Sequence, residues 1–470
     1  MVFNSLTFVV FFACVLVLHN LPLSWTTKKI NLLIASYIFY AAWNPPFIIL
    51  LWVSTVVDWY AAQGLVKAKR EAARHAWMLL SVVANLGMLA YFKYGQFMLD
   101  NFMALMASLG VAWQPAKYDI VLPVGISFYT FATMSYTLDV YLRRAAPARN
   151  LLDYALFVTF FPHLVAGPIM RPTELVPQFE QPRRTTGAQL RFGLALMTLG
   201  LFNKIVLADS FLSDIAERVY DADKIPGALD AWAATLAFSG QIFCDFAGYS
   251  TTAIGAALCL GFAMPDNFRF PYAAVGFSDF WRRWHVSLSS WLRDYLYVSL
   301  GGNRHGEWRT YRNLMLTMLI GGLWHGAAWT FVIWGGLHGL YLAGERFVRE
   351  HLWPNNWRAP GFLRAGYMLL TLLLVTLAWI FFRSPDAPTA LHVIAQMWPS
   401  EHGVALDAAQ KLALCAFAGV VVVQWGMRER EVKEFVGGLP APALGAALGL
   451  LLAAIVLAPG DSHAFIYFQF

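Results

Sequence analysis

Three histidines lie in or beside apolar sequence, where an ionisable side chain is expensive and usually has a function. His325 lies in the stretch Leu319-Ile-Gly-Gly-Leu-Trp-His-Gly-Ala-Ala-Trp329. The glycines leave room around its ring, and Trp324 and Trp329 can form the walls of a pocket. Because burial keeps an imidazole neutral, His325 is suited to take a proton from a hydroxyl group. A packed histidine bonded to a carbonyl group is the alternative interpretation.

His338 follows His325 at about 220° further round a continuous helix, at roughly 100° for each residue. The two histidines are therefore predicted to face apart and not to form a metal pair. A packed core histidine is an equally good interpretation of His338. The sequence has no HExxH, GxSxG or Walker A pattern, so metal-dependent hydrolysis, esterase and nucleotide functions lack support. We predict no metal site and no tightly bound cofactor.

His285 belongs to a segment, Trp281–Tyr295, whose apolar residues recur at helical period. The apolar stripe contains Trp281, Trp284, Leu288, Trp291, Leu292 and Tyr295, and the polar side contains Arg282, Arg283, Ser289, Ser290 and Arg293. This pattern predicts a basic amphipathic helix in the cytoplasmic interface of a membrane, with His285 at the edge of the stripe. A simple interfacial anchor is the alternative.

Asp245 is a carboxylate within the otherwise apolar stretch Gln241–Ser250. A carboxylate in such surroundings needs a cation or several hydrogen-bond donors close by. Lys204, in a second apolar run, is the cation that can answer it. A structural ion pair is the simplest interpretation of the two residues.

The composition is that of a polytopic membrane protein. Of the 470 residues, 59% are hydrophobic and only 13% are charged, whereas soluble domains carry about 25% charged residues. This excludes a cytosolic globular enzyme and a disordered protein. Since about twenty apolar residues make one membrane-spanning helix, the chain can hold roughly ten to a dozen. The net charge of +6 is typical of a membrane protein whose cytoplasmic loops are basic. We therefore expect no nucleic-acid partner.

The order of apolar runs predicts the topology. Runs that can cross a membrane are 5–21, 30–44, 47–63, 76–94, 119–141, 190–208, 231–262, 313–345 (as a hairpin), 364–382, 410–427 and 441–459. Run 152–170 differs, because it lies between basic segments and contains Pro162, His163 and Pro168. We expect it to enter and leave on the cytoplasmic side. Such irregular backbone survives at membrane depth only when it is buried in protein or lines a cavity.

Several stretches resemble one family, the membrane-bound O-acyltransferases. They are Phe161-Pro-His-Leu-Val-Ala-Gly-Pro-Ile-Met-Arg-Pro172, Gln241–Ser250, Phe280-Trp-Arg-Arg-Trp-His-Val-Ser-Leu-Ser-Ser-Trp291, Leu323-Trp-His-Gly326, Leu122–Phe131 and the closing Phe465–Phe470. The similarity is greatest to the bacterial branch that acetylates alginate, which also includes proteins of D-alanylation and of peptidoglycan O-acetylation. It implies one all-α domain, 1–470, shaped as a cup of about 11–12 transmembrane helices with re-entrant and interfacial helices around a central funnel.

The resemblance also implies roles for single residues. The family's catalytic histidine falls on His325 and its second histidine on His285. The donor, acetyl-CoA or the thioester of an acyl carrier, would reach them from the cytoplasm. Arginines can attract its phosphates or an acidic carrier protein, and aromatic and polar residues can shape its tunnel. The residues expected to bind the donor or line the tunnel are Asp245, Trp324, Arg282, Arg283, Arg293 and His163.

The expected function is therefore O-acetylation of an exported or cell-wall polysaccharide at the bacterial inner membrane. The resemblance implies a periplasmic partner similar to the SGNH hydrolases, which would pass the acyl group to the polymer. Two alternatives stay open at this point. One is a transporter or flippase for an activated sugar or lipid-linked intermediate, and the other is a non-catalytic membrane scaffold.

Overall fold

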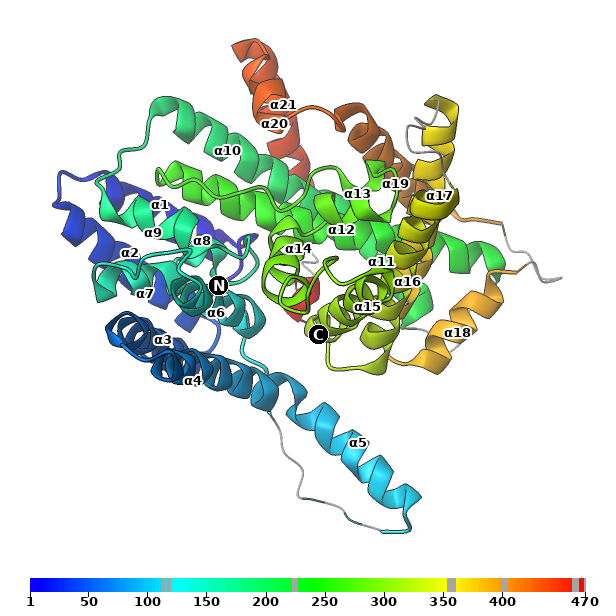
Figure 1. Ribbon diagram of the computed structural model, residues 1–470. Coiled ribbons are helices and arrows are strands. Elements are labelled where there is room, and N and C mark those ends of the chain that lie inside the picture. Colours follow the sequence, from blue (N-terminus) through cyan, green and yellow to red (C-terminus); the bar gives the residue numbers. More distant parts are fainter. Residues whose placement is uncertain are drawn as a thin grey trace. The chain divides into compact units, whose positions relative to one another are not determined.

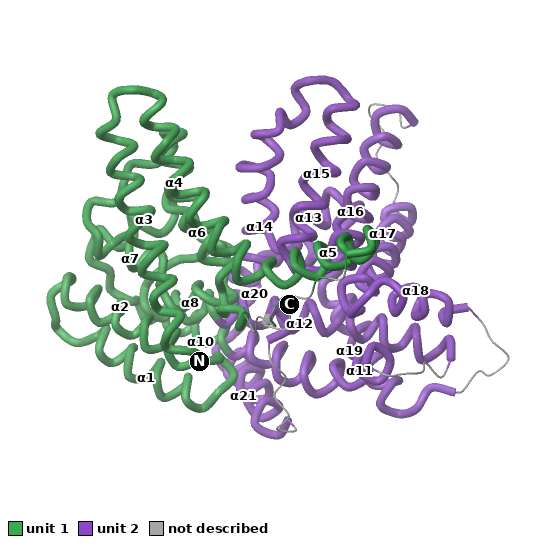
Figure 2. The backbone as a smooth tube through the Cα atoms, turned by 90° about the horizontal axis from the view of Figure 1, so that it is seen from below, with its two compact units in different colours: residues 1–197, 253–265 green, residues 198–252, 266–470 purple. Residues whose placement is uncertain are grey.

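All regular elements in the described part of the chain are helices (Figure 1). The computed structural model describes residues 1–111, 113, 115, 120–221, 227–352, 361–398, 405–458 and 465–468. The chain divides into two compact units (Figure 2): unit 1 holds residues 1–197 and 253–265, and unit 2 holds residues 198–252 and 266–470. The predicted all-α class is confirmed, and a single domain over 1–470 stays a prediction.

Six helical stretches among the described residues are long and apolar enough to cross a membrane. They are Pro45–Lys67, Glu71–Ser108, Gly187–Tyr220, Ala228–Cys259, Gly361–Arg383 and Ala408–Met427. Two shorter apolar helices, α1 (Leu6–Asn20) and α21 (Ala441–Leu457), coincide with predicted runs. The total of eleven or twelve crossings and the central funnel stay predictions.

Unit 1 is built around a polar network buried between three of its helices. Asn85 donates an amide hydrogen to Asp58 Oδ2 at 2.9 Å, and the Thr137 hydroxyl donates to Asp58 Oδ1 at 3.3 Å. The Ser54 hydroxyl donates to Asn85 Oδ1 at 2.8 Å. Because hydrocarbon offers no hydrogen bonds, polar side chains at membrane depth must bond to one another. Besides α1 and the start of α10 (Gly187–Leu201), the elements of unit 1 are α2 (Trp25–Ala41), η1 (Pro45–Phe47), α3 (Ile48–Lys67), α4 (Glu71–Leu89), η2 (Ala90–Tyr94), α5 (Gly95–Ser108), α6 (Ile126–Tyr141), α7 (Leu151–Thr159), α8 (Phe161–Leu164) and α9 (Pro172–Glu180).

The sequence predicted that run 152–170 is not one continuous helix, and the structure agrees. α7 ends at Thr159, and the short helix α8 then carries Pro162 and His163. Gly167 brings the backbone so close to Pro162 and His163 that a Cβ atom would collide with both. Entry and exit on one side of the membrane stay a prediction.

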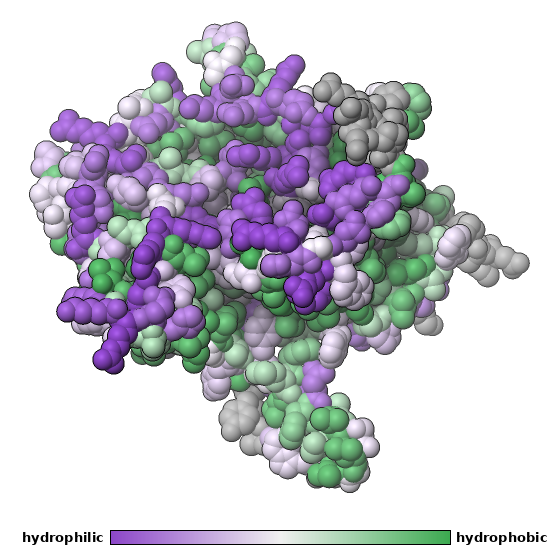
Figure 3. Space-filling model, in the orientation of Figure 1, coloured by the Kyte–Doolittle hydropathy of each residue, from purple (hydrophilic) through white to green (hydrophobic). Residues whose placement is uncertain are grey.

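α5 extends the stretch Glu71–Ser108 beyond the length that one crossing needs. This stretch has 38 residues, about 57 Å of helix, whereas the hydrocarbon core is about 30 Å thick. No residue of α5 is buried, and Met98, Phe102 and Leu105 are exposed. Figure 3 shows this arm as mostly hydrophobic. α5 therefore presents its apolar side chains outside the core of unit 1.

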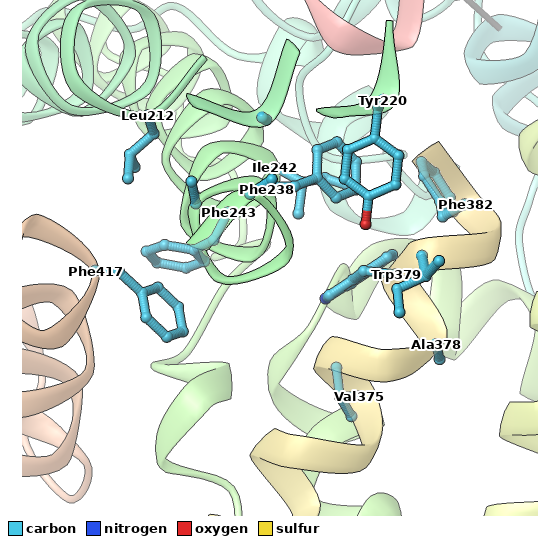
Figure 4. Packing of buried hydrophobic residues seen from close by; sticks show 14 of the residues in the cluster. Leu212, Tyr220, Phe238, Ile242, Phe243, Val375, Ala378, Trp379, Phe382 and Phe417 are labelled. Carbon is cyan, nitrogen blue, oxygen red and sulfur yellow. The ribbon is translucent and has the colours of Figure 1, made fainter. Parts of the chain in front are cut away.

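Unit 2 has an aromatic core, part of which Figure 4 shows. α12, α17 and α19 contribute Phe238, Trp379 and Phe417 to it. Within a bilayer, close packing of this kind holds helices together, since lipid is as apolar as the side chains. Besides α21 and the end of α10, the elements of unit 2 are η3 (Phe202–Leu212), α11 (Ser213–Tyr220), most of α12 (Ala228–Cys259), η4 (Pro271–Ala273), α13 (Phe277–Arg283), α14 (Val286–Trp291), η5 (Leu292–Tyr297), α15 (Glu307–His325), α16 (Trp329–Phe347), η6 (Val348–Leu352), α17 (Gly361–Arg383), α18 (Ala387–Gln396), α19 (Ala408–Met427), α20 (Val432–Gly437) and η7 (Ile466–Phe468).

The hairpin predicted within 313–345 is confirmed, and it is formed by α15 and α16. Their backbones approach closely where Gly322 faces Gly335. A Cβ atom added to Gly335 would collide with the carbonyl oxygen of Met318 and lie 3.1 Å from the Cα of Gly322. Small residues at such crossings allow helices in membranes to pack backbone against backbone.

Gly335→Ala should therefore destabilise the hairpin by about 1–3 kcal/mol, because the new methyl group must push α16 away from α15. The neighbouring Gly336→Ala is the matched control, since a Cβ atom there meets only the side chain of Leu319, at 3.5 Å. Alanine favours a helix over glycine by about 1 kcal/mol, so the control should melt at the same or a higher temperature. Equal melting temperatures of the two variants in detergent would contradict the close approach.

Candidate active site

His325 is the last residue of α15, and its imidazole is enclosed by aromatic rings. The ring centroids of Trp324 and Trp334 lie 5.0 and 4.9 Å from that of His325, both edge to face. Phe382 lies at 5.4 Å and Tyr467 at 5.6 Å, and His325 is only 2% exposed. An apolar enclosure around an imidazole is therefore present, as predicted. Trp329 is not part of it, because its side chain is 59% exposed at the start of α16.

His285 lies beside His325 in unit 2. The two ring centroids are 6.5 Å apart. Trp324 contacts both rings, at 5.9 Å from His285 and 5.0 Å from His325. The structure thus brings together, in one buried cluster, the two histidines and the tryptophan that the sequence singled out.

The prediction of one continuous amphipathic helix over Trp281–Tyr295 was wrong. The helix breaks between α13 and α14, where His285 takes the left-handed conformation with φ at 43°. His285 is fully buried rather than at the edge of an interfacial stripe. A break was not visible in the periodicity, because Trp284 and Leu288 are buried on either side of it. At the break, the chain contacts Asn267, which lies outside both helices.

Asn267 sets the orientation of the His285 ring. Its carbonyl oxygen accepts the backbone N–H of Val286 at 2.9 Å, and its side-chain Oδ1 accepts the Ser287 hydroxyl at 2.8 Å. Oδ1 also lies 3.2 Å from His285 Nδ1. Because Oδ1 can only accept, the hydrogen of the neutral imidazole is assigned to Nδ1, and the lone pair to Nε2. Burial lowers the pKa of His285 to about 3, so the ring is neutral at physiological pH.

Asp245 belongs to a buried ion cluster of three residues. Lys204 Nζ lies 2.7 Å from Asp245 Oδ1 and 2.8 Å from Asp209 Oδ1, with all three side chains almost fully buried. The predicted pairing of Lys204 with Asp245 is confirmed. Asp209 was missed, because Lys204 and Asp209 are five residues apart and an α-helix would not align them. They lie in the π-helix η3, whose wider turn brings residues i and i+5 together.

Asp245 also holds the closing segment of the chain. Its Oδ2 accepts the backbone N–H of Ile466 at 2.7 Å. The segment packs with the Phe465 ring 4.6 Å from Tyr249 and the Tyr467 ring 5.6 Å from His325. Tyr467 therefore forms one wall of the site. The sequence had indicated this residue only as a member of the closing motif Phe465–Phe470. The last two residues of that motif, Gln469 and Phe470, lie outside the described residues.

The three arginines expected at the donor site have different surroundings. Arg283 is held inside the protein: it pairs with Asp279 at 2.8 Å and donates to the carbonyl oxygen of Arg428 at 3.1 Å. Burial alone would raise the pKa of Asp279, but the Val275 N–H and the two arginines outweigh it and keep this pKa below its usual value. Arg282 is exposed, and Arg293 is largely exposed beside Asp294. Arg282 and Arg293 can thus meet a ligand, whereas Arg283 serves the local structure.

His163 lies in unit 1, on α8. Its Nε2 is 2.9 Å from the carbonyl oxygen of Phe157, to which the ring donates, and the side chain is buried against Phe157 and Phe160. This contact joins α8 to α7 and gives His163 a structural role. A role of His163 in a tunnel stays a prediction.

Comparison with known proteins gives a consistent set of relatives. Residues 6–383 match the profile of MBOAT, the membrane-bound O-acyltransferase family. The chain is 41% identical over 423 residues to the probable alginate O-acetylase AlgI of Azotobacter vinelandii, covering 88% of this chain and 83% of that protein. It is 36% identical over 397 residues to the peptidoglycan O-acetyltransferase of Helicobacter pylori, covering 78% and 73%. The teichoic acid D-alanyltransferase of Bacillus subtilis is 28% identical over 267 residues, covering 51% and 64%.

Asp245→Ala should release the closing segment, because Ile466 loses its acceptor while Lys204 keeps Asp209. We expect carboxypeptidase to remove C-terminal residues about tenfold faster, the scale of one lost hydrogen bond to a charged group. Mass spectrometry of the protein in detergent measures the rate. Asp221→Ala is the matched control, since it removes a half-exposed carboxylate that pairs with Arg383. Equal trimming of the two variants would show that Asp245 does not hold the segment.

Proposed function

The chain belongs to the membrane-bound O-acyltransferase family, and from this we propose that it transfers an acetyl group from a cytoplasmic thioester toward an exported polysaccharide. The observation that supports the proposal most is the buried pair His285 and His325, joined through Trp324. Two buried imidazoles in an aromatic enclosure suit proton transfer. Membership of an acyltransferase family favours this reaction over transport and over a scaffold role.

In the proposed reaction His325 is the general base. It takes the proton from the hydroxyl group of the acceptor molecule, and the oxygen of that group forms a bond to the thioester carbonyl carbon. The carbon–sulfur bond then breaks, and the proton passes to the leaving thiolate, so that the imidazole returns to its neutral form. General acid–base catalysis of this kind contributes about 10²–10⁴-fold to a rate.

His285 has a different task in this proposal. Since its Nδ1 hydrogen points at Asn267, the Nε2 that remains is an acceptor and not a donor. It is therefore poorly suited to stabilise an oxyanion by donating a hydrogen bond. It is suited to accept an N–H or O–H of the donor and so to orient the thioester toward His325. This geometry therefore favours a role of His285 in orienting the donor over a role in polarising its carbonyl group.

The names of the relatives support the proposed acceptor. The names of the related proteins describe O-acetylation of alginate and of peptidoglycan and D-alanylation of teichoic acid. Their common substrate class is a polymer outside the cytoplasm, and the higher identities belong to the acetylases. We propose an exported or cell-wall polysaccharide as the final acceptor, the bacterial inner membrane as the location, and a periplasmic SGNH-hydrolase-like partner that completes the transfer.

His325→Ala should reduce acetyl transfer by about 10²–10⁴-fold, because the base is lost while insertion into the membrane is unaffected. The measurement uses purified protein in detergent with radiolabelled acetyl-CoA and follows release of label or its transfer to a partner. His392→Ala, which alters an exposed histidine on α18, is the control and should keep full activity. Unchanged turnover in His325→Ala would remove His325 from the mechanism.

Arg282→Ala should raise KM for acetyl-CoA several-fold and leave kcat unchanged, because an exposed arginine far from the bond changes would contribute equally to the bound donor and to the transition state. The KM difference should shrink as salt is added, since exposed charges are screened. Arg283→Ala should instead lower the melting temperature, because Asp279 loses one of its two arginines. A KM that is unaffected by Arg282→Ala at low salt would contradict a role in donor binding.

A further inference from the structure

His338 is fully buried in α16, in a cluster of aromatic rings. The centroids of the Trp334 and Trp281 rings lie 4.8 and 5.1 Å from that of His338. Phe280 stacks on His338 at 5.9 Å with an interplanar angle of 13°. Tyr341 lies at 5.7 Å. These residues belong to α13 and α16, and together they surround the imidazole on several sides.

Tyr341 donates its hydroxyl hydrogen to the carbonyl oxygen of Leu374 at 3.2 Å, but the ring nitrogens of the cluster are in a different situation. In the part of the chain that the structure describes, neither ring nitrogen of His338 has a hydrogen-bond partner, and both are buried. The same holds, within the described ranges, for the indole Nε1 atoms of Trp281 and Trp334. A buried polar atom without a partner is unfavourable. A phenylalanine at position 338 would fill the same space without this cost, so packing alone does not account for an imidazole here.

Trp334 connects His338 with His325. It lies one helical turn before His338 on α16, and its ring contacts His338 at 4.8 Å and His325 at 4.9 Å. The face of Trp334 is also stacked on Trp379 at 5.4 Å with an interplanar angle of 22°. The expectation that the two histidines face apart was calculated for a continuous helix between them. Since α15 ends at His325, both histidines instead contact the same indole.

We propose that His338 is a positioning residue for His325 and acts through Trp334. A neutral imidazole offers one hydrogen-bond acceptor, the indole N–H of Trp334 is a donor, and the two rings are in contact although no hydrogen bond joins them in this structure. In the working enzyme a rotation of the rings pairs the donor with the acceptor and so fixes the orientation of the Trp334 indole. The edge-to-face contact between Trp334 and His325 then holds the base in its reactive orientation. The inference rests on the proposed function only in taking His325 as that base.

The test compares three variants at position 338. His338→Phe keeps an aromatic ring but has no nitrogen, whereas His338→Asn and His338→Gln place an amide near the positions of Nδ1 and Nε2. We expect His338→Phe to keep the melting temperature and the KM for the donor and to lose kcat about tenfold or more, as misplaced catalytic groups do. One of the two amide variants should restore most of the lost kcat. Full kcat in His338→Phe, or no recovery in either amide variant, would overturn the proposal.

A second readout needs no donor and therefore separates this inference from the proposed function. Diethylpyrocarbonate modifies neutral imidazoles, and mass spectrometry gives its rate at His325 in each variant. The rate should change in His338→Phe and return toward the wild-type value in the amide variant that restores kcat. An unchanged rate would overturn the positioning role, even if acetyl-CoA proved not to be the donor.

The matched control is a buried histidine elsewhere. His19 in α1 is 3% exposed and packs against Trp25 and Phe262 within unit 1. His19→Phe should leave both kcat and the modification rate of His325 unchanged. If His19→Phe had the same effect as His338→Phe, the effect would be a general consequence of changing a buried histidine, and the proposal would fail.

Discussion

The ammonium group of Lys204 is the charge on which the candidate site depends. It pairs with Asp209 and Asp245, and all three side chains are almost fully buried. Burying the two carboxylates without such a partner would be strongly unfavourable. Asp245 uses its second oxygen to hold the backbone of Ile466. The closing segment is thereby kept where Tyr467 contacts His325. One buried cation thus connects the π-helix η3, the long helix α12 and the end of the described chain.

The two histidines owe their positions to breaks in helices. α15 ends at His325, and the helical conformation is interrupted at His285, between α13 and α14. There Asn267 accepts a backbone N–H and lies beside the His285 ring. A side chain at a helix end or in a left-handed residue can point where no residue of a regular helix points. Such backbone is tolerated because protein surrounds it. The same breaks bring Trp324 into contact with both His285 and His325. They also bring Trp334 into contact with both His325 and His338.

The parts of the fold and site that were predictable are those with a local cause. Apolar runs gave the all-α class, the hairpin of α15 and α16 and the irregular run 152–170, because burial in lipid requires such composition. The pair of Lys204 and Asp245 was predictable because a buried charge needs an opposite one. Asp209 was not, since its alignment with Lys204 depends on a π-helix. The break at His285 was not predictable either, because the contacts that Asn267 makes there do not show in the helical period of Trp281–Tyr295.

The sequence by itself determined the membrane class and the family and singled out His285 and His325 as candidates, because these follow from composition and from residue types at fixed spacing. Only the tertiary structure decided which tryptophans enclose His325, which arginines remain exposed and which nitrogen of His285 carries the hydrogen. Each of these depends on partners outside the helix that carries the residue, such as Asn267 for His285 and the carbonyl oxygen of Arg428 for Arg283. Periodicity describes one element at a time, whereas the chemistry of a buried side chain is set by the other elements packed against it.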